Sequence, residues 1–422
     1  MTGGRLGILA RGLWNLRRAP DLAALRAAAS PDELARLALI PAARNMGIAI
    51  GFLAADMRAE ATAALLACRV LDAYEDLIDR PLAGSAVRTA AEYLSGSTDT
   101  PPPPPDRVTV RDSEAVDLVL AERSADVRSL VSALPAEGRE RVARLLLDIG
   151  DVMARNLDSP LSRVAYSEGV LGRVTHYACS LVAEEACAEA DLRELTGCVG
   201  VIAQAANDLR DGELALYGVA DHEELTRAVM LRLLAPALGG FALLARLGPR
   251  TSSPGAKAAM AYMTVTTTGF LCTAVGAPVP YRRPVGAAAL AAWSPAFWTK
   301  MVERVQRCAD QAIHRVLDAS PELGTGSDAA AQLLGAIDPR ALSPSMVPLI
   351  VDTTFALVRA LPEEPLTGRL SASDIRTMMI ADHLAFGALE RLPPRGAEAM
   401  RALATNFQLA ALDTTTAGGD HP

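Results

Sequence analysis

The chain has 422 residues and a formal net charge of −8; half of its residues are hydrophobic and only 4% are aromatic. Alanine and leucine dominate, whereas the β-branched and aromatic residues that favour strands are sparse. The composition therefore predicts an all-α fold. Arginines are spread among acidic residues rather than clustered, so the chain lacks the basic surface by which proteins bind nucleic acids.

The six cysteines include no CxxC pair, and the five histidines are scattered along the chain. Reduced thiols and a cytoplasmic location are therefore expected, and no zinc site is predicted. We expect neither a secretory signal nor a transmembrane segment, because no window holds about 20 uninterrupted apolar residues.

Helical periodicity begins near Pro31, and the first long helix is predicted over residues 42–80. Residues 95–111 contain five consecutive prolines and predict a loop. Seven more helices are predicted, over residues 113–133, 136–156, 162–189, 192–219, 222–247, 255–275 and 296–318.

These segments form one predicted domain, residues 1–320. After a linker at 321–327, further helices form a predicted C-terminal extension, residues 321–422, packed on the same bundle. The helices expected in this extension cover residues 328–336, 345–360, 372–391 and 396–412.

The first candidate site lies in the predicted helix over residues 42–80. Its spacing places Asp72, Asp76 and Asp79 on one face, with Glu75 beside them and Arg69 one turn earlier. Carboxylates at this spacing repel one another, and a divalent cation would remove that penalty. The segment predicts either a face that holds a metal-bridged diphosphate or a solvated acidic surface.

The second candidate site ends an uncharged, largely apolar run. By the same spacing one helix face carries Gln204, Asn207, Asp208 and Asp211. Buried polar groups need partners, so this segment predicts a ligand-binding wall, an internal polar network or a helix-end charge cluster. Together the two segments predict a helical bundle in which two acidic walls face a central cavity.

At these two segments the chain resembles the squalene and phytoene synthase family, within the class I isoprenoid synthases. The stretch LLACRVLDAYEDLID is similar to the family's first aspartate-rich motif, LRALDTxED, with matches at Arg69, Asp72 and Asp76. The stretch AQAANDLRDGELALYG is similar to the second motif, QxxNxxRDxxED. The matches there are Gln204, Asn207, Arg210 and Asp211.

Two shorter segments extend the resemblance over about residues 35–315. Arg44 matches the arginine of an upstream SRSF segment, which contacts diphosphate in the family. The stretch RVTHYACSLVAEEA resembles the YCHYVAG segment, with His176, Tyr177 and Cys179 approximately in register.

The resemblance implies a role for each matched residue. The implied Mg²⁺ ligands are Asp72, Glu75, Asp76, Asn207 and Asp211. The implied diphosphate-binding residues are Arg44, Arg69 and Arg210. Tyr177 and Asp208 are further candidate catalytic residues. Either Asp208 or the released diphosphate would accept the proton from the acceptor.

The chain also departs from the family. Ala215 stands where the second motif normally ends with an aspartate, and Glu213 is displaced by two positions onto another helix face. In the third segment, Val174 and Ser180 replace a tyrosine and a glycine. These departures disfavour joining two prenyl diphosphates. They imply transfer of one prenyl group, from dimethylallyl to farnesyl in length, to a small aromatic acceptor of the indole or carbazole type, as in bacterial secondary metabolism.

Three alternatives stay open at this point. The chain could condense two prenyl diphosphates head to head, if another carboxylate replaces the missing one. It could be a terpene cyclase, although the scarcity of aromatic residues leaves little to shield a migrating cation. It could also be an inactive helical scaffold, and the sequence leaves a homodimer open.

Overall fold

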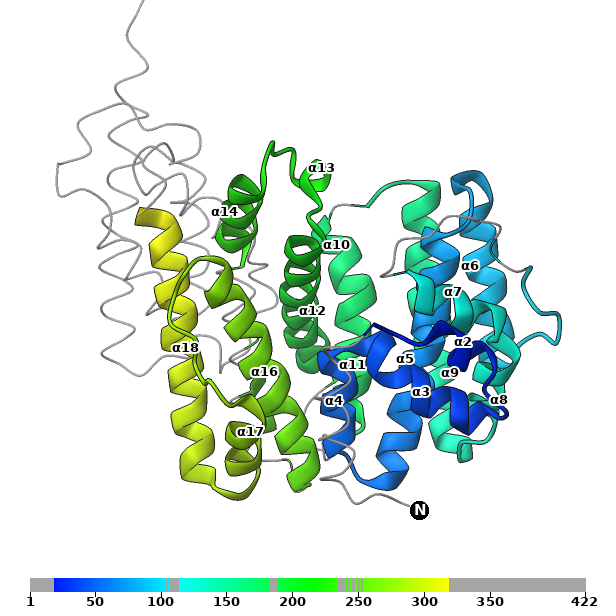
Figure 1. Ribbon diagram of the computed structural model, residues 1–422, viewed down its shortest axis with the longest axis horizontal. Coiled ribbons are helices and arrows are strands. Elements are labelled where there is room, and N and C mark those ends of the chain that lie inside the picture. Colours follow the sequence, from blue (N-terminus) through cyan, green and yellow to red (C-terminus); the bar gives the residue numbers. More distant parts are fainter. Residues whose placement is uncertain are drawn as a thin grey trace, which may run out of the picture. The chain divides into compact units, whose positions relative to one another are not determined.

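The computed structural model describes residues 19–103, 105, 114–161, 163–182, 189–233, 240, 243–244, 247–248, 251 and 253–318 (Figure 1). Every regular element in these residues is helical, which confirms the all-α prediction. The predicted extension over residues 321–422 lies outside the described residues. Within the described part, no helix is long and apolar enough to span a membrane.

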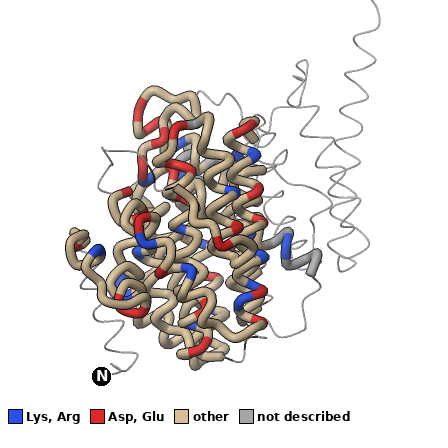
Figure 2. The backbone as a smooth tube through the Cα atoms, turned by 90° about the vertical axis from the view of Figure 1, so that its right-hand side faces the viewer, with Lys and Arg blue, Asp and Glu red and all other residues tan. Residues whose placement is uncertain are grey.

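The chain divides into two compact units. The first comprises residues 1–186, 250–266 and 281–301, and the second comprises residues 187–249, 267–280 and 302–422. Lys, Arg, Asp and Glu residues are scattered along the tube of Figure 2, which is otherwise mostly uncharged. The single domain predicted over residues 1–320 stays a prediction.

The core of the first unit is built around α5 (Ala55–Asp76). Leu66, Val70, Leu71 and Tyr74 of this helix are fully buried. Helix α5 packs against α3 (Pro31–Ala43), α6 (Arg80–Ser95), α7 (Ala115–Glu122), α8 (Ser124–Ser132) and α9 (Ala136–Asp158). The remaining helices wholly in this unit are α2 (Leu22–Arg26), α4 (Asn45–Phe52), α10 (Arg163–Ser167), the π-helix η1 (Glu168–Gly172), α11 (Arg173–Ser180) and α17 (Pro284–Trp293).

The second unit contains α12 (Glu189–Asp211), α13 (Leu214–Tyr217) and α14 (His222–Arg232). Its described core joins Leu209 of α12 to Leu225 and Val229 of α14. Helices α16 (Pro254–Ala274) and α18 (Pro295–Asp318) contribute residues to both units.

Local sequence signals account for several helix ends. At the start of α3, the Ser30 hydroxyl accepts a hydrogen bond from the Glu33 N–H, and the Glu33 carboxylate accepts one from the Ala29 N–H. Helix α6 ends at Gly96, whose φ of 83° suits a residue without a Cβ. The predicted boundaries of α9, α16 and α18 agree with the structure to within two residues.

The predicted helix over residues 42–80 is wrong at both ends. Arg44, with a φ of 46°, separates α3 from α4, and extended backbone at Leu53 and Ala54 separates α4 from α5. Helix α5 ends at Asp76, so Asp79 does not share its face but precedes α6. Pro81 explains the new start, because proline lacks an N–H and is accommodated in the first turn of a helix.

Other predicted helices are also interrupted. Residues 113–133 form α7 and α8, which meet at Arg123, and residues 162–189 contain the π-helix η1. Gly212, with a φ of 72°, ends α12 within the predicted helix 192–219. Helices α2, α6 and α17 are additional to the predicted elements.

Candidate active site

Acidic side chains gather at the last turn of α5. Core packing of Val70, Leu71, Ala73 and Tyr74 fixes the opposite face of this helix. The carboxylates of Asp72, Glu75 and Asp76 interact electrostatically with one another at this turn. Free carbonyl groups add negative potential at a helix C-terminus, so carboxylates there need compensating positive charge.

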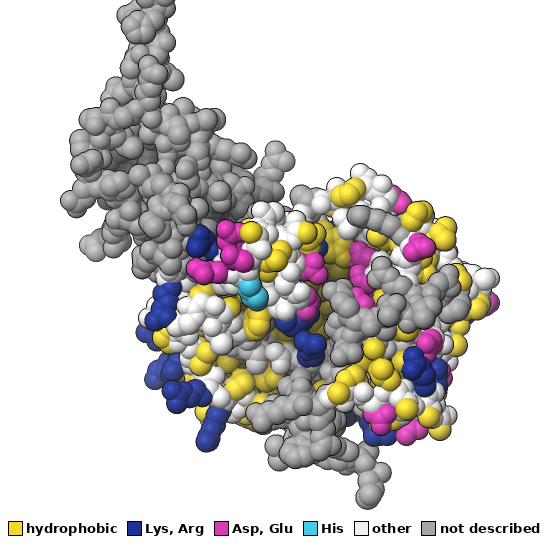
Figure 3. All heavy atoms as spheres, turned by 45° about the horizontal axis from the view of Figure 1, so that its top comes forward, with side chains coloured by type: hydrophobic (Ala, Val, Ile, Leu, Met, Phe, Trp, Pro, Cys, Tyr) yellow, Lys and Arg dark blue, Asp and Glu magenta, His cyan; other side chains and the backbone are white. Residues whose placement is uncertain are grey.

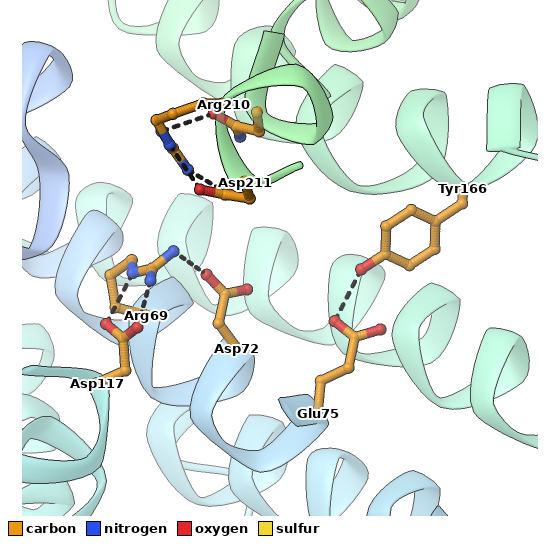
Figure 4. Close-up of polar contacts among 8 residues, drawn as sticks. Arg69, Asp72, Glu75, Asp117, Tyr166, Arg210 and Asp211 are labelled. Atoms are coloured by element: carbon orange, nitrogen blue, oxygen red, sulfur yellow. Dashed lines mark hydrogen bonds and ion pairs between the residues drawn. The ribbon is translucent and has the colours of Figure 1, made fainter. Parts of the chain in front are cut away.

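Arg69 supplies part of that compensation. Its Nη1 donates to Asp72 Oδ2 at 2.5 Å, and its Nε donates to Asp117 Oδ1 at 2.9 Å. A further bond from Nη2 to Asp117 completes a bidentate pair, shown in Figure 4. Burial acts to lower the pKa of Arg69, but the charges of Asp72, Asp117 and Asp76 outweigh it and raise that pKa. The two hydrogen bonds to Asp117 thus hold the Arg69 guanidinium next to Asp72.

Glu75 has a different partner, Tyr166 of α10. The Tyr166 hydroxyl donates to Glu75 Oε2 at 2.7 Å (Figure 4), and the Arg163 guanidinium lies 5.2 Å from the centre of the Tyr166 ring. Burial, followed by the charges of Asp72 and Asp76, raises the pKa of Glu75 to about 8, although the bond from Tyr166 opposes this. The Glu75 carboxyl group therefore ionises at a higher pH than an ordinary glutamate side chain.

The pKa values of Asp76 and Asp72 are also raised. Desolvation, followed by the charge of Asp72, raises the pKa of Asp76 to about 7. Burial also raises the pKa of Asp72, with Arg69 opposing. The first site thus carries more negative charge than Arg69 can balance, and an added cation would stabilise the ionised carboxylates.

The donors of this site fit Mg²⁺, which prefers hard oxygen ligands and binds proteins through one or two carboxylates, completing its shell with water and phosphate oxygens. Asp72 and Asp76 offer such oxygens one turn apart. Among the described residues, no group of three or more His, Cys, Asp or Glu side chains could enclose a metal ion.

The second candidate site, at the end of α12, contains two separate polar groups. Arg210 pairs with Asp211 through Nε at 2.9 Å and Nη2 at 2.7 Å, and its Nη1 donates to Asn207 Oδ1 at 3.1 Å (Figure 4). These three side chains lie at least partly in solvent. The side-chain oxygen atoms of Asn207 and Asp211 thus lie beside the guanidinium group of Arg210.

Asp208 belongs to the interior of the second unit, where it is 2% exposed. Its Oδ1 accepts a hydrogen bond from Gln204 Nε2 at 2.9 Å, and its Oδ2 accepts one from the Tyr217 hydroxyl at 2.9 Å. This arrangement is the internal polar network that the sequence left open. The proton-acceptor role of Asp208 stays a prediction.

The end of α12 alters the interpretation of the missing aspartate. Glu213 was expected on another face of a continuous helix, but it lies in the break between α12 and α13. Ala215 is an exposed residue of α13. Gly212 causes this change, since its positive φ reverses the chain directly after Asp211.

Tyr177 lies away from the acidic end of α5. Its hydroxyl donates to Glu60 Oε1 at 3.2 Å, and Glu60 also forms a bidentate pair with Arg141. Glu60 precedes Asp72 by twelve residues on the same helix, or roughly 18 Å along its axis. Tyr177 is therefore part of a structural network of the first unit.

Arg44 occupies an unusual backbone conformation, with φ 46° and ψ −115°, at the junction of α3 and α4. Its side chain is exposed. A residue with a Cβ rarely adopts a positive φ, and such strain is concentrated at functional positions. The strained backbone thus marks Arg44 as a candidate functional residue, independently of the sequence motif.

Two residues of the first site, Asp117 and Tyr166, escaped the sequence analysis. Asp117 stands 48 residues after Arg69 in sequence, so no local spacing connects them. Tyr166 had a usable signal. Tyr166, Val170 and Gly172 match the Y, V and G of the YCHYVAG pattern better than the register chosen around Tyr177.

No family model matches the chain, and no curated protein matches its sequence. Two solved structures of a squalene synthase, TcSQS, are similar to it. The complex of TcSQS with the ligand BPH1237 has 16% sequence identity and a TM-score of 0.49, and the match covers 67% of this chain and 97% of that one. The complex with E5700 has 15% identity and a TM-score of 0.47, covering 77% and 98%.

Proposed function

We propose that this protein is a Mg²⁺-dependent prenyltransferase that ionises an allylic diphosphate. The observation that carries the proposal is the group of carboxylates at the end of α5. Desolvation and mutual repulsion raise the pKa of Glu75 and Asp76, and Arg69 alone does not balance their charge. A face with this deficit of positive charge is suited to binding a metal-bridged diphosphate.

Asp72 and Asp76 would hold the metal, with Glu75 as an auxiliary ligand. Bound Mg²⁺ would neutralise charge that develops on the departing diphosphate. Asp117 accepts hydrogen bonds from Nε and Nη2 of Arg69. The remaining nitrogen, Nη1, can therefore donate to Asp72 or to a phosphate oxygen. Tyr166 orients the Glu75 carboxylate by donating to Oε2.

The proposal assigns the same diphosphate to residues of α12. Asn207 and Asp211 would supply oxygen ligands, and Arg210 would exchange part of its pairing with them for phosphate oxygens. Arg44 would add a third guanidinium. If the two groups share one metal-bridged ligand, their variants must be coupled. Asp72→Asn and Asp211→Asn should then be strongly non-additive in kcat/KM, the double variant losing little more than the worse single variant.

We further propose a neutral aromatic acceptor, of the indole or carbazole type. Ala215 supports this choice, because the second motif lacks the last carboxylate that a two-diphosphate reaction would use. The break after Gly212 supports it further, since Glu213 does not continue the face of Asn207 and Asp211.

A product assay tests the proposal. The purified chain is incubated with Mg²⁺ and dimethylallyl, geranyl or farnesyl diphosphate, each with and without indole and carbazole acceptors, and products are identified by mass spectrometry. A covalent adduct that disappears with Asp72→Asn, but persists with the surface control Asp158→Asn, is the expected result. A hydrocarbon formed without any acceptor would overturn the acceptor proposal. Absence of Mg²⁺-dependent binding of a diphosphate analogue in calorimetry would overturn the enzyme proposal itself.

A further inference from the structure

The exposed face of α17, a helix of the first unit, is apolar. Helix α17 has the sequence PVGAAALAAW and contains no polar side chain. Its buried positions are Ala287, Ala288 and Ala291. Its exposed positions include Gly286, Ala289, Leu290 and Trp293.

The spacing of these exposed residues, i, i+3, i+4 and i+7, places them on one helix face. The two largest side chains of the helix therefore point outward, with Leu290 57% and Trp293 78% exposed, while small alanines fill the core. A surface helix ordinarily has the reverse arrangement. A face of this kind is stabilised when it is covered by an apolar medium.

Basic residues flank α17 on both sides in the sequence. Residues 281–301 contain Arg282, Arg283 and Lys300, all exposed, and no Asp or Glu, in a chain with a net charge of −8. The rings of Tyr281 and Phe297 pack 6.0 Å apart, which holds the arginine pair near the start of α18. Figure 3 shows Lys and Arg side chains gathered along the left-hand edge of that view.

We infer that α17 and its basic flanks form a docking surface for a lipid bilayer with anionic headgroups. Trp and Leu bury their apolar parts at the headgroup boundary, and Lys and Arg contact the negative headgroups. A second copy would instead present the same apolar helix with the same basic flanks, and so would offer no negative charge to pair with Arg282, Arg283 and Lys300. The inference does not depend on the proposed enzyme activity, because vesicle binding needs neither substrate nor metal.

Vesicle flotation with the full chain tests the inference. Vesicles of phosphatidylcholine alone are compared with vesicles that also contain phosphatidylglycerol, in low salt and in about 0.5 M NaCl, where charges are screened within a few ångströms. We expect at least tenfold tighter binding to the anionic vesicles, and loss of most of that preference at high salt. Arg282→Gln with Arg283→Gln should weaken anionic binding about tenfold or more.

The apolar contribution is tested by Leu290→Ser with Trp293→Ser, expected to reduce binding at least tenfold. Leu82→Ser is the matched control, since Leu82 is 64% exposed on α6 of the same unit; its binding should stay within twofold of the parent chain. Equal flotation with both vesicle types, or unchanged binding by the Leu290 and Trp293 variant, would overturn the inference. A dimer in light scattering that this variant dissociates, without vesicle binding by the parent chain, would assign the face to a second copy instead.

Discussion

Replacing Asp76 by asparagine should stabilise the metal-free protein while it abolishes activity. Asp76 is crowded by Asp72, Glu114 and Asp117, and its pKa is raised from 3.8 to about 7 by desolvation first and these charges second. At pH 8 the ionised side chain therefore opposes folding. Asparagine keeps the shape of the group and removes its charge.

The raised pKa bounds the size of this gain. A difference of roughly 3 pKa units corresponds to at most about 4 kcal/mol. The Asp76 side chain is exposed, however, and solvent screens exposed charges strongly, so we expect about 1 kcal/mol. The sign follows from linkage. A carboxyl with a raised folded-state pKa gives its full stability below the unfolded pKa and loses it as pH rises through the folded pKa.

Urea denaturation in EDTA measures this effect. Asp76→Asn should exceed the parent chain in unfolding free energy at pH 8, and the gain should shrink at pH 5, where the parent side chain is largely protonated. Mg²⁺ with pyrophosphate should stabilise the parent and leave the variant unchanged. The reasoning is refuted if Asp76→Asn destabilises the metal-free protein at pH 8, since Asp76 would then be a structural partner and not a strained ligand.

Three further variants probe the site. Arg69→Gln should lower the unfolding free energy by about 2–3 kcal/mol, because it leaves the buried Asp117 and the half-buried Asp72 without their guanidinium partner. Arg88→Gln, at a surface ion pair, should cost no more than about 0.5 kcal/mol in the same denaturation assay. Tyr166→Phe should reduce kcat at least about tenfold and raise the pKa of Glu75, read by NMR titration, while Tyr177→Phe should lower stability by about 1 kcal/mol and leave kcat unchanged; equal kinetic losses would contradict the site assignment. Arg44→Gly should raise the melting temperature slightly, by relief of up to about 1 kcal/mol of backbone strain, yet raise KM for the diphosphate; an unchanged KM would remove Arg44 from the site.

Local periodicity predicted most of the long helices because it depends on neighbours three and four residues apart. The spacing of Asp72 and Asp76 placed them on one face before any tertiary information was available. The same reasoning failed at Asp79, where the helix ends before the pattern does. Helix ends depend on single residues such as Pro81 and Gly212, so the hydrophobic period does not reveal them.

The sequence by itself determined the helical class of the protein, the acidic turn of α5 and the polar end of α12, since each depends on residues within a few positions of one another. Only the tertiary structure decided which distant groups complete the first site. Helix packing pairs Arg69 with Asp117, 48 residues away in the sequence, and Glu75 with Tyr166, 91 residues away. It also pairs Tyr177 with Glu60. The physical reason is that pairing of charges and hydroxyl groups depends on distance in space, which helix packing sets and which no local repeat of the sequence encodes.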